Sequence, residues 1–232
     1  MKLSTNTARV YRSLYSAYTR WCAIRSLDER SFDVVISYLI ERSRVVSFVS
    51  LGLDRSAIGH HHRTSPGDTP VDSDRFRGFL RVITRKMSRS KTPKKAATRD
   101  ITRLMLETCD STPVGVRNRA ILTVLFATGM RGGELAALTW EDLTFADGDV
   151  SFLIRRSKTD QEGIGRSVSA AARADSFCPV SALVAWRNVG GDTGPVFTSF
   201  KHRQRRAICQ KSVALVVKEA AKAAGFDPKD FG

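Results

Sequence analysis

The chain has 232 residues, and its 38 Lys and Arg against 23 Asp and Glu give a formal net charge of +15 at pH 7. With 42% hydrophobic and 26% charged residues, the composition is that of a globular protein and excludes disordered and collagen-like chains. The most apolar stretches, residues 34–40 and 45–53, are interrupted by serines and fall short of the roughly 20 residues that a membrane span needs. Residues 1–17 carry no apolar signal-peptide core, so a cytoplasmic location is expected.

The cysteines and histidines predict no metal site. Cys22, Cys109, Cys178 and Cys209 lie far apart and form no Cys-x-x-Cys pair, so neither a zinc ribbon nor a disulfide framework is expected. The three histidines at positions 60–62 point in different directions if they lie on a helix, and no nearby Cys, Asp or Glu completes a ligand set.

The positive charge is concentrated in the first part of the chain. Residues 1–97 contain 19 basic and 8 acidic residues, whereas the remainder contains 19 basic and 15 acidic residues. A basic excess of this size indicates a polyanionic partner, of which nucleic acid is the commonest. A merely soluble basic surface is the alternative.

The first part of the chain reads as an all-helical bundle. Apolar residues at steps of three and four predict a helix over residues 7–26 and a second that begins near Ser31. Residues 45–62 look helical in part, with an interruption near Gly52, and a last helix covers residues 76–87.

A mixed second domain is predicted after a basic linker at residues 88–97, which has four basic residues, one proline and no acidic residue. Alternating apolar residues predict a strand over residues 149–155. Residues 167–169 are expected to pair with this strand in antiparallel orientation. The remaining elements are helices over residues 100–109, 117–128, 180–188 and 212–224.

Residues 128–143, with the sequence TGMRGGELAALTWEDL, are the most informative stretch of the chain. A helix stops at Gly129, Arg131 sits in the turn, and Glu134 follows on the next helix, close enough to orient the guanidinium group. A planar guanidinium suits two oxygens of one phosphate. Taken alone, the Arg131–Glu134 pair would be interpreted by default as a structural ion pair.

This stretch resembles the first active-site box of the tyrosine recombinases, the phage integrase family. The family box reads approximately T-G-x-R-x-x-E-L, which is matched by Thr128, Gly129, Arg131, Glu134 and Leu135. Lys158 follows at the mouth of the predicted hairpin, where the family carries a catalytic lysine. The resemblance covers nearly the whole chain, including AIGHHHR at residues 57–63 and KEAAKAAGFDPKDFG at residues 218–232.

The resemblance implies a mainly α fold with a small antiparallel sheet. Residues 1–87 would form the helical core-binding (SAM-like) DNA-binding domain, residues 88–97 the linker, and residues 98–232 a truncated α/β tyrosine-recombinase catalytic domain. The implied activity is site-specific cutting and rejoining of DNA strands through a 3′-phosphotyrosine, without cofactor. Arg131 would neutralise the phosphate oxygens, Glu134 would hold Arg131, and Lys158 would protonate the leaving 5′-oxygen.

The family's second box, His-x-x-Arg followed by the nucleophilic tyrosine, is expected after residue 232, so we expect the chain to be catalytically incomplete. Its tyrosines, Tyr11, Tyr15, Tyr18 and Tyr38, all fall in the helical domain. Residues 202–205 spell H-x-x-R but precede the helix at 212–224, and we interpret them as a solvated or phosphate-contacting loop.

Double-stranded DNA is the expected partner. From charge and linker position, we expect phosphate contacts from Arg12, Arg20, Arg85, Arg89, Lys91, Lys94 and Lys95. Members of the family form homotetrameric synapses, whereas this chain is expected to be a monomer. The alternative function is that of a non-catalytic DNA-binding protein that occupies recombination sites, and a general DNA-compacting protein is a third.

Overall fold

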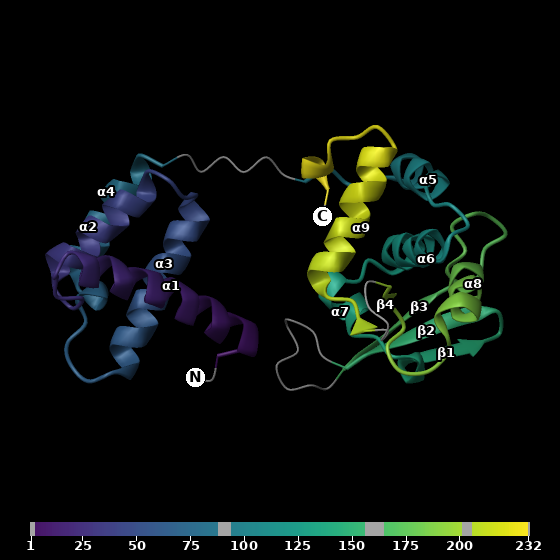
Figure 1. The fold of residues 1–232 in the computed structure, drawn as a ribbon, viewed down its shortest axis with the longest axis horizontal. Coiled ribbons are helices and arrows are strands. Elements are labelled where there is room, and N and C mark those ends of the chain that lie inside the picture. The colour runs from purple at the N-terminus through teal and green to yellow at the C-terminus, as the bar shows by residue number, and fades with distance from the viewer. Residues whose placement is uncertain (1–2, 88–93, 156–164, 201–205, 232) are drawn as a thin grey trace. The chain divides into compact units, whose positions relative to one another are not determined.

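The computed structural model describes residues 3–87, 94–155, 165–200 and 206–231, and the chain divides into two compact units, Met1–Lys91 and Thr92–Gly232 (Figure 1). Each unit has its own hydrophobic core. No helix among the described residues is long and apolar enough to cross a membrane.

The N-terminal unit is built from helices. Its elements are α1 (Thr5–Ile24), α2 (Phe32–Ser43), α3 (Phe48–Thr64), a 3₁₀ helix (Pro70–Asp72) and α4 (Asp74–Arg85). Serine side chains cap three of the four α-helices by accepting a backbone N–H: Ser4, Ser47 and Ser73. Tyr18, Leu39 and other apolar side chains form the core, as the helical spacing predicted.

The expected interruption near Gly52 is wrong, because α3 runs through this residue without a break. Gly52 is exposed, and a Cβ atom there would meet nothing within 4 Å. A glycine inside a helix costs about 1 kcal/mol relative to alanine. The burial of Leu51, directly before Gly52, and of Ile58, six residues after it, keeps the helix continuous despite this cost.

The C-terminal unit combines five described helices with small antiparallel sheets. The helices are α5 (Arg99–Glu107), α6 (Pro113–Thr128), α7 (Gly132–Ala136), α8 (Pro179–Gly190) and α9 (Gln210–Ala223). The strands are β1 (Leu143–Ala146), β2 (Asp149–Ile154), β3 (Arg166–Ala170), β4 (Thr198–Ser199) and β5 (Arg206–Ala207). The mainly α fold with a small antiparallel sheet is thus confirmed.

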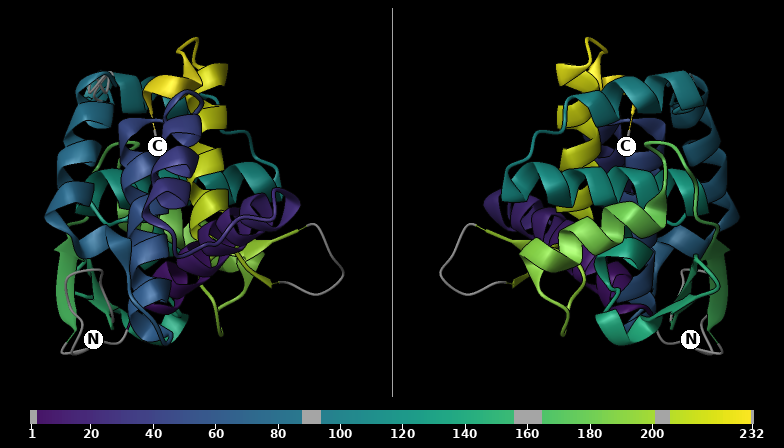
Figure 2. Two further views of the ribbon diagram at one scale, coloured as in Figure 1. Left: turned by 90° about the vertical axis from the view of Figure 1, so that its left-hand side faces the viewer. Right: turned by 90° about the vertical axis from the view of Figure 1, so that its right-hand side faces the viewer.

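The three-stranded sheet has the order β1-β2-β3, with Ile154 opposite Arg166 and Val150 opposite Ala170. The predicted strand pair is therefore confirmed, whereas β1 and the β4–β5 pair were not anticipated. Val150 and Phe152 point into the core, and α6 and α8 cover this face of the sheet (Figures 1 and 2).

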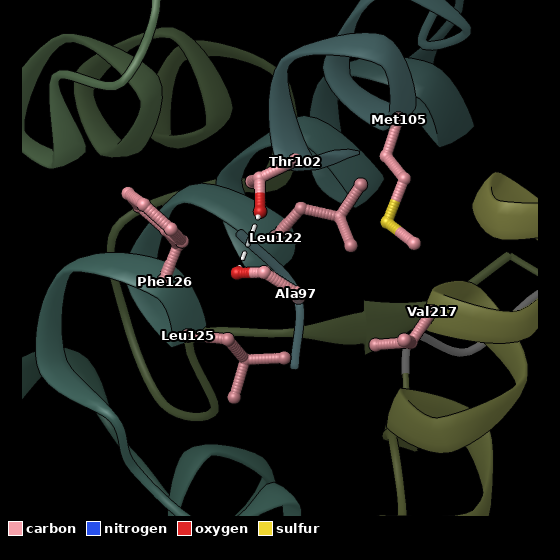
Figure 3. Close-up of a pocket in the computed structure, with 7 residues that line it drawn as sticks. All are labelled: Ala97, Thr102, Met105, Leu122, Leu125, Phe126 and Val217. Atoms are coloured by element: carbon pink, nitrogen blue, oxygen red, sulfur yellow. Dashed lines mark hydrogen bonds between the residues drawn. The ribbon is translucent and has the colours of Figure 1, made fainter. Parts of the chain in front are cut away.

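An apolar pocket of about 310 Å³ opens among α5, α6 and α9 (Figure 3). The only hydrogen bond drawn there joins the hydroxyl of Thr102 to the carbonyl oxygen of Ala97, at 3.4 Å. Because its lining carries no charged side chain, this pocket has no group for chemistry on a phosphate. The lining residues are Ala97, Thr102, Met105, Leu122, Leu125, Phe126 and Val217.

Trp186 is the largest fully buried side chain of the C-terminal core, and its indole N–H donates to the carbonyl oxygen of Val196 at 2.6 Å. We expect Trp186→Ala to lower the free energy of unfolding of this unit by about 3–5 kcal/mol through the cavity it leaves. Denaturant unfolding followed by circular dichroism measures the loss. Val184→Ala, at a 46% exposed site on the same helix, should change little.

His62 makes the N-terminal unit sensitive to acid. Its side chain is fully buried, and neither ring nitrogen has a hydrogen-bond partner among the residues that the structure describes. Burial, together with the nearby charge of Arg30, holds the pKa of His62 below its ordinary value of 6.5. The unfolded chain therefore binds the proton more readily, so stability should fall as the pH drops below about 6.5. Thermal melts of the wild type and His62→Phe should show a weaker pH dependence in the variant, and equal dependence would contradict this account.

Candidate active site around Arg131

The turn between α6 and α7 holds Arg131 at the start of a helix. Gly129 ends α6 with a φ of +63°, a left-handed conformation that favours glycine. Arg131 is the N-cap residue of α7, and its backbone N–H donates to a carboxylate oxygen of Glu134 at 3.1 Å. This hydrogen bond fixes the backbone of Arg131 independently of the contacts of its side chain.

The carboxylate of Glu134 binds two guanidinium groups. Its Oε1 accepts from Nη1 of Arg131 at 2.8 Å, and its Oε2 accepts from Nη2 of Arg166 at 3.1 Å. Only 4% of the Glu134 side chain is exposed, against about half of each arginine side chain. Burial alone would raise the pKa of Glu134, but the hydrogen bonds from Arg131 and Arg166 outweigh it and the pKa is lowered.

Arg166 was missed by the sequence analysis. The return strand was expected to begin at Ser167, but β3 begins one residue earlier and Arg166 pairs with Ile154 across the ladder. Extending the alternating pattern by one residue would have placed Arg166 in the strand, but nothing in the local sequence pairs it with a glutamate 32 residues earlier.

A second buried carboxylate, that of Asp142, anchors the other strand of the hairpin. It accepts the backbone N–H of Thr139 at 2.9 Å, which completes a capping box, and Nε–H of Arg155 at 2.5 Å. Burial would raise the pKa of Asp142, and the hydrogen bonds from Thr139 and Arg155 lower it on balance. Arg155 directly follows β2, and Arg166 is the first residue of β3. Their contacts with Asp142 and Glu134 therefore attach both strands to the segment between α6 and β1.

Lys158, the predicted general acid, lies outside the described residues, as do Arg89, Lys91 and the H-x-x-R sequence at 202–205. The structure does describe both ends of the segment that contains Lys158. A Cβ atom at Gly165 would lie 3.3 Å from the carbonyl oxygen of Ile154, which shows how closely the two ends approach.

Helix α9 begins beside the arginine turn. A Cβ atom at Gly132 would lie 3.3 Å from Cγ1 of Val213, and one at Gly133 would lie 3.4 Å from Oε1 of Gln210. The Gly-Gly pair after Arg131 therefore gives α9 room to pack against α7, and this function of the two glycines was not foreseen from the sequence.

The described part of the site is cationic. The guanidinium groups of Arg131, Arg155 and Arg166 outnumber the carboxylates of Glu134 and Asp142, and each guanidinium has more N–H donors than its carboxylate uses. Among residues 3–87, 94–155, 165–200 and 206–231, no group of three His, Cys, Asp or Glu is placed to hold a metal ion. This arrangement can bind an oxyanion through hydrogen bonds and charge.

The other predicted DNA contacts have different surroundings. Arg12 and Arg20 are exposed on α1, and Arg85 is exposed in the last turn of α4. Lys95 forms an ion pair with Asp230 at 2.6 Å, and the side chain of Lys94 donates to the carbonyl oxygen of Lys229. The last residues of the predicted linker are therefore attached to the C-terminal unit.

The fold described above is that of the tyrosine recombinase class. A family model described as the phage integrase family matches residues 95–231, which is more than half of the chain. The chain therefore belongs to the phage integrase family.

Two relatives illustrate the similarity. An integrase/recombinase XerD homologue of Selenomonas ruminantium is 25% identical over 237 residues, which cover 97% of this chain and 70% of that protein. Tyrosine recombinase XerC of Xanthomonas axonopodis pv. citri (strain 306) is 31% identical over 122 residues, which cover 53% of this chain and 36% of XerC. The aligned part of this chain thus spans about a third of XerC.

Solved structures show the same fold. The crystal structure of a lambda integrase dimer bound to a COC′ core site gives a TM-score of 0.63 at 19% identity and covers 97% of this chain and 60% of that chain. The Tn1549 transposon integrase in complex with transposon right end DNA gives a TM-score of 0.63 at 16% identity, with coverage of 95% and 74%.

Replacing Glu134 with glutamine tests how the arginines are held. Glu134→Gln removes the charge shared by Arg131 and Arg166, so we expect the free energy of unfolding of the C-terminal unit to fall by about 2 kcal/mol. Because the pKa of Glu134 is lowered from its ordinary 4.5, this contribution is present above about pH 4.5 and is lost as the pH falls through the folded-state pKa. Denaturant titrations above and below this range measure both effects. Glu107→Gln, at an exposed residue of α5, is the control, and equal losses in the two variants would contradict this explanation.

Proposed function

We propose that this protein takes part in site-specific recombination of double-stranded DNA, with Arg131 as the group that binds the scissile phosphate. The single observation that carries the proposal is the convergence of Arg131 and Arg166 on the buried carboxylate of Glu134. A phosphoryl transfer passes through a state with more negative charge on the non-bridging oxygens, and a guanidinium held in place before the reaction stabilises that charge.

In this proposal Glu134 is a positioning residue and Lys158 is the general acid. Glu134 fixes Arg131 through its backbone N–H and its side chain, at 3.1 and 2.8 Å. Lys158 would protonate the departing 5′-oxygen, since an alkoxide is a poor leaving group. Support for this role comes from Arg155 and Arg166, which anchor the two ends of the segment around Lys158 beside the arginine turn.

We further propose that the attacking tyrosine comes from outside these 232 residues. Tyr11, Tyr15, Tyr18 and Tyr38 all belong to the N-terminal unit. Burial and the hydrogen bond to Glu29 raise the pKa of Tyr15 to about 12, and burial also raises the pKa values of Tyr18 and Tyr38. A raised pKa opposes formation of the phenolate that attacks phosphorus. Because three of these four tyrosines have raised pKa values, we expect the 232 residues alone to be catalytically incomplete.

The assembly state and location belong to the same proposal. Structural neighbours include a lambda integrase tetramer bound to a Holliday junction, and assembly of this chain on DNA would follow that pattern. Without DNA we expect a monomer, because a net charge of +15 makes protomers repel one another. We also expect the protein to act in the cytoplasm. The placement of the tyrosines also favours a second function, that of a DNA-binding protein that occupies recombination sites without cutting them.

A suicide-substrate assay on nicked attachment-site duplex tests the catalytic proposal. This chain is mixed with a tyrosine recombinase that keeps its nucleophilic tyrosine but lacks the arginine that corresponds to Arg131. The covalent protein–DNA adduct is then measured by denaturing electrophoresis. We expect Arg131→Gln to reduce adduct formation by about 100-fold or more, the range seen when one transition-state hydrogen-bond donor is removed. Arg103→Gln, at a half-exposed arginine paired with Asp100, is the matched control.

Two outcomes would contradict the proposal. An adduct formed by this chain alone would overturn the claim that the tyrosine comes from elsewhere. Equal adduct yields for the wild type and Arg131→Gln would remove Arg131 from the reaction. If no mixture reacts but the chain blocks recombination by a complete relative, the site-occupying function takes its place.

A further inference from the structure

The first and last described segments of the C-terminal unit are joined to one another (Figure 1). The backbone N–H of Lys95 donates to the carbonyl oxygen of Asp230 at 2.9 Å, and Nζ of Lys95 lies 2.6 Å from Oδ2 of Asp230. Nζ of Lys94 donates to the carbonyl oxygen of Lys229. The end of the predicted linker is therefore closed onto the short 3₁₀ helix at Pro228–Asp230.

Both segments are also held by contacts that do not involve the two lysines. The carboxylate of Asp227 accepts the backbone N–H of Lys229 at 2.8 Å and so caps the 3₁₀ helix. The side chain of Phe231 is 2% exposed, and its ring lies 6.0 Å from that of Phe226. On the other segment, the side chain of Thr98 accepts a backbone N–H as the N-cap of α5. The lysines can therefore leave the 3₁₀ helix without unfolding either segment.

The contacts of the two lysines use the donors that a phosphate would use. A lysine ammonium donates to a carboxylate or carbonyl oxygen in the same way as to a non-bridging phosphate oxygen. The hydrogen bond with Asp230 raises the pKa of Lys95, which keeps the ammonium charged at neutral pH. Because 67% of the Lys95 side chain is exposed, water and salt weaken the ion pair, and a competing anion can reach it.

We propose that Asp230 forms an autoinhibitory contact, which withholds Lys95 and the neighbouring Lys94 from DNA until a duplex is bound. When duplex DNA is present, a phosphate group of its backbone replaces the carboxylate of Asp230 on Lys95, and the end of the linker separates from the 3₁₀ helix. The exchange is favourable because a duplex presents closely spaced phosphates, and each phosphate that is neutralised releases condensed counterions. This inference rests on the proposed function to the extent that the polyanion is duplex DNA.

The contact links DNA binding to the end of the C-terminal unit. Residues 218–232 resemble the helix and turn that lead into the second active-site box of the family. Breaking the Lys95–Asp230 pair on DNA would free residues 228–230 from the linker at the moment when the substrate arrives. By reciprocity, whatever holds Asp230 away from Lys95 must strengthen DNA binding.

Equilibrium binding of the full chain to duplex DNA tests this contact. Asp230→Asn removes the carboxylate that competes with phosphate, so we expect DNA binding to strengthen about threefold, as for the loss of one exposed ion pair. Glu107→Gln is the matched control, because it removes one negative charge from an exposed residue of the same unit that is not a partner of Lys95. Circular dichroism establishes that both variants are folded.

Variants of Lys95 show whether the gain passes through this lysine. Lys95→Gln removes the cation that is placed on a phosphate, so the slope of log K against log salt should become less negative by about 0.9. In the Lys95→Gln background, Asp230→Asn should strengthen binding no more than Glu107→Gln does. If Asp230→Asn is not folded, the salt slope of Lys95→Gln still tests the proposal.

Hydrogen exchange at the amide of Lys95 shows whether the contact opens. This N–H is bonded to the carbonyl oxygen of Asp230, so it should exchange faster when saturating duplex DNA is added. The amide of Val196, which donates to the carbonyl oxygen of Leu138 at 2.9 Å, is the control and should keep its rate.

Equal gains in DNA affinity for Asp230→Asn and Glu107→Gln would overturn the proposal, and so would an unchanged salt slope in Lys95→Gln. A Lys95 amide that exchanges at the same rate or more slowly on DNA would mean that the contact stays closed in the complex, which also overturns it. These outcomes leave the proposed function of the Arg131 site intact, whereas a wild-type chain that does not bind duplex DNA contradicts both.

Discussion

The buried carboxylate of Glu134 is the group on which the arrangement of the cationic site depends. A charge with 4% of its side chain exposed must be paired, and Glu134 is paired with the guanidinium groups of two separate elements, the α6–α7 turn and β3. The contact with Arg131 is local in sequence, and the contact with Arg166 spans 32 residues. One acidic side chain thereby joins a helix start to a strand and leaves guanidinium N–H groups available for an anion.

The cationic site of the C-terminal unit is held in place by buried carboxylates. The buried carboxylates of Glu134 and Asp142 are paired with arginines whose side chains are about half exposed or more. Each carboxylate sets the position of its guanidinium groups, whose exposed parts keep N–H donors that the carboxylate does not use. This arrangement gives fixed guanidinium groups in the C-terminal unit.

The features that local sequence controls could be predicted, and those that depend on distant contacts could not. The stop at Gly129, the Arg131–Glu134 contact and the Thr139–Asp142 capping box lie within a few residues of one another and follow from turn and cap chemistry. The β2–β3 pairing followed from alternation. Arg166 and Arg155 act through carboxylates 32 and 13 residues away, and no local pattern identifies such partners.

The error at Gly52 has a related cause, because helix propensity was weighed without the core contacts of Leu51 and Ile58 that keep α3 continuous.

If Arg131 binds an anion as proposed, the sharing of Glu134 would link the position of the hairpin to the occupancy of the arginine. Any shift of β3 that withdraws Arg166 changes the field at the carboxylate and hence the free energy with which Arg131 holds an anion. By reciprocity, an anion at Arg131 must bias the hairpin toward one arrangement by the same amount. The carboxylate of Glu134 would thus couple the α6–α7 turn to the start of β3 across 32 residues of sequence.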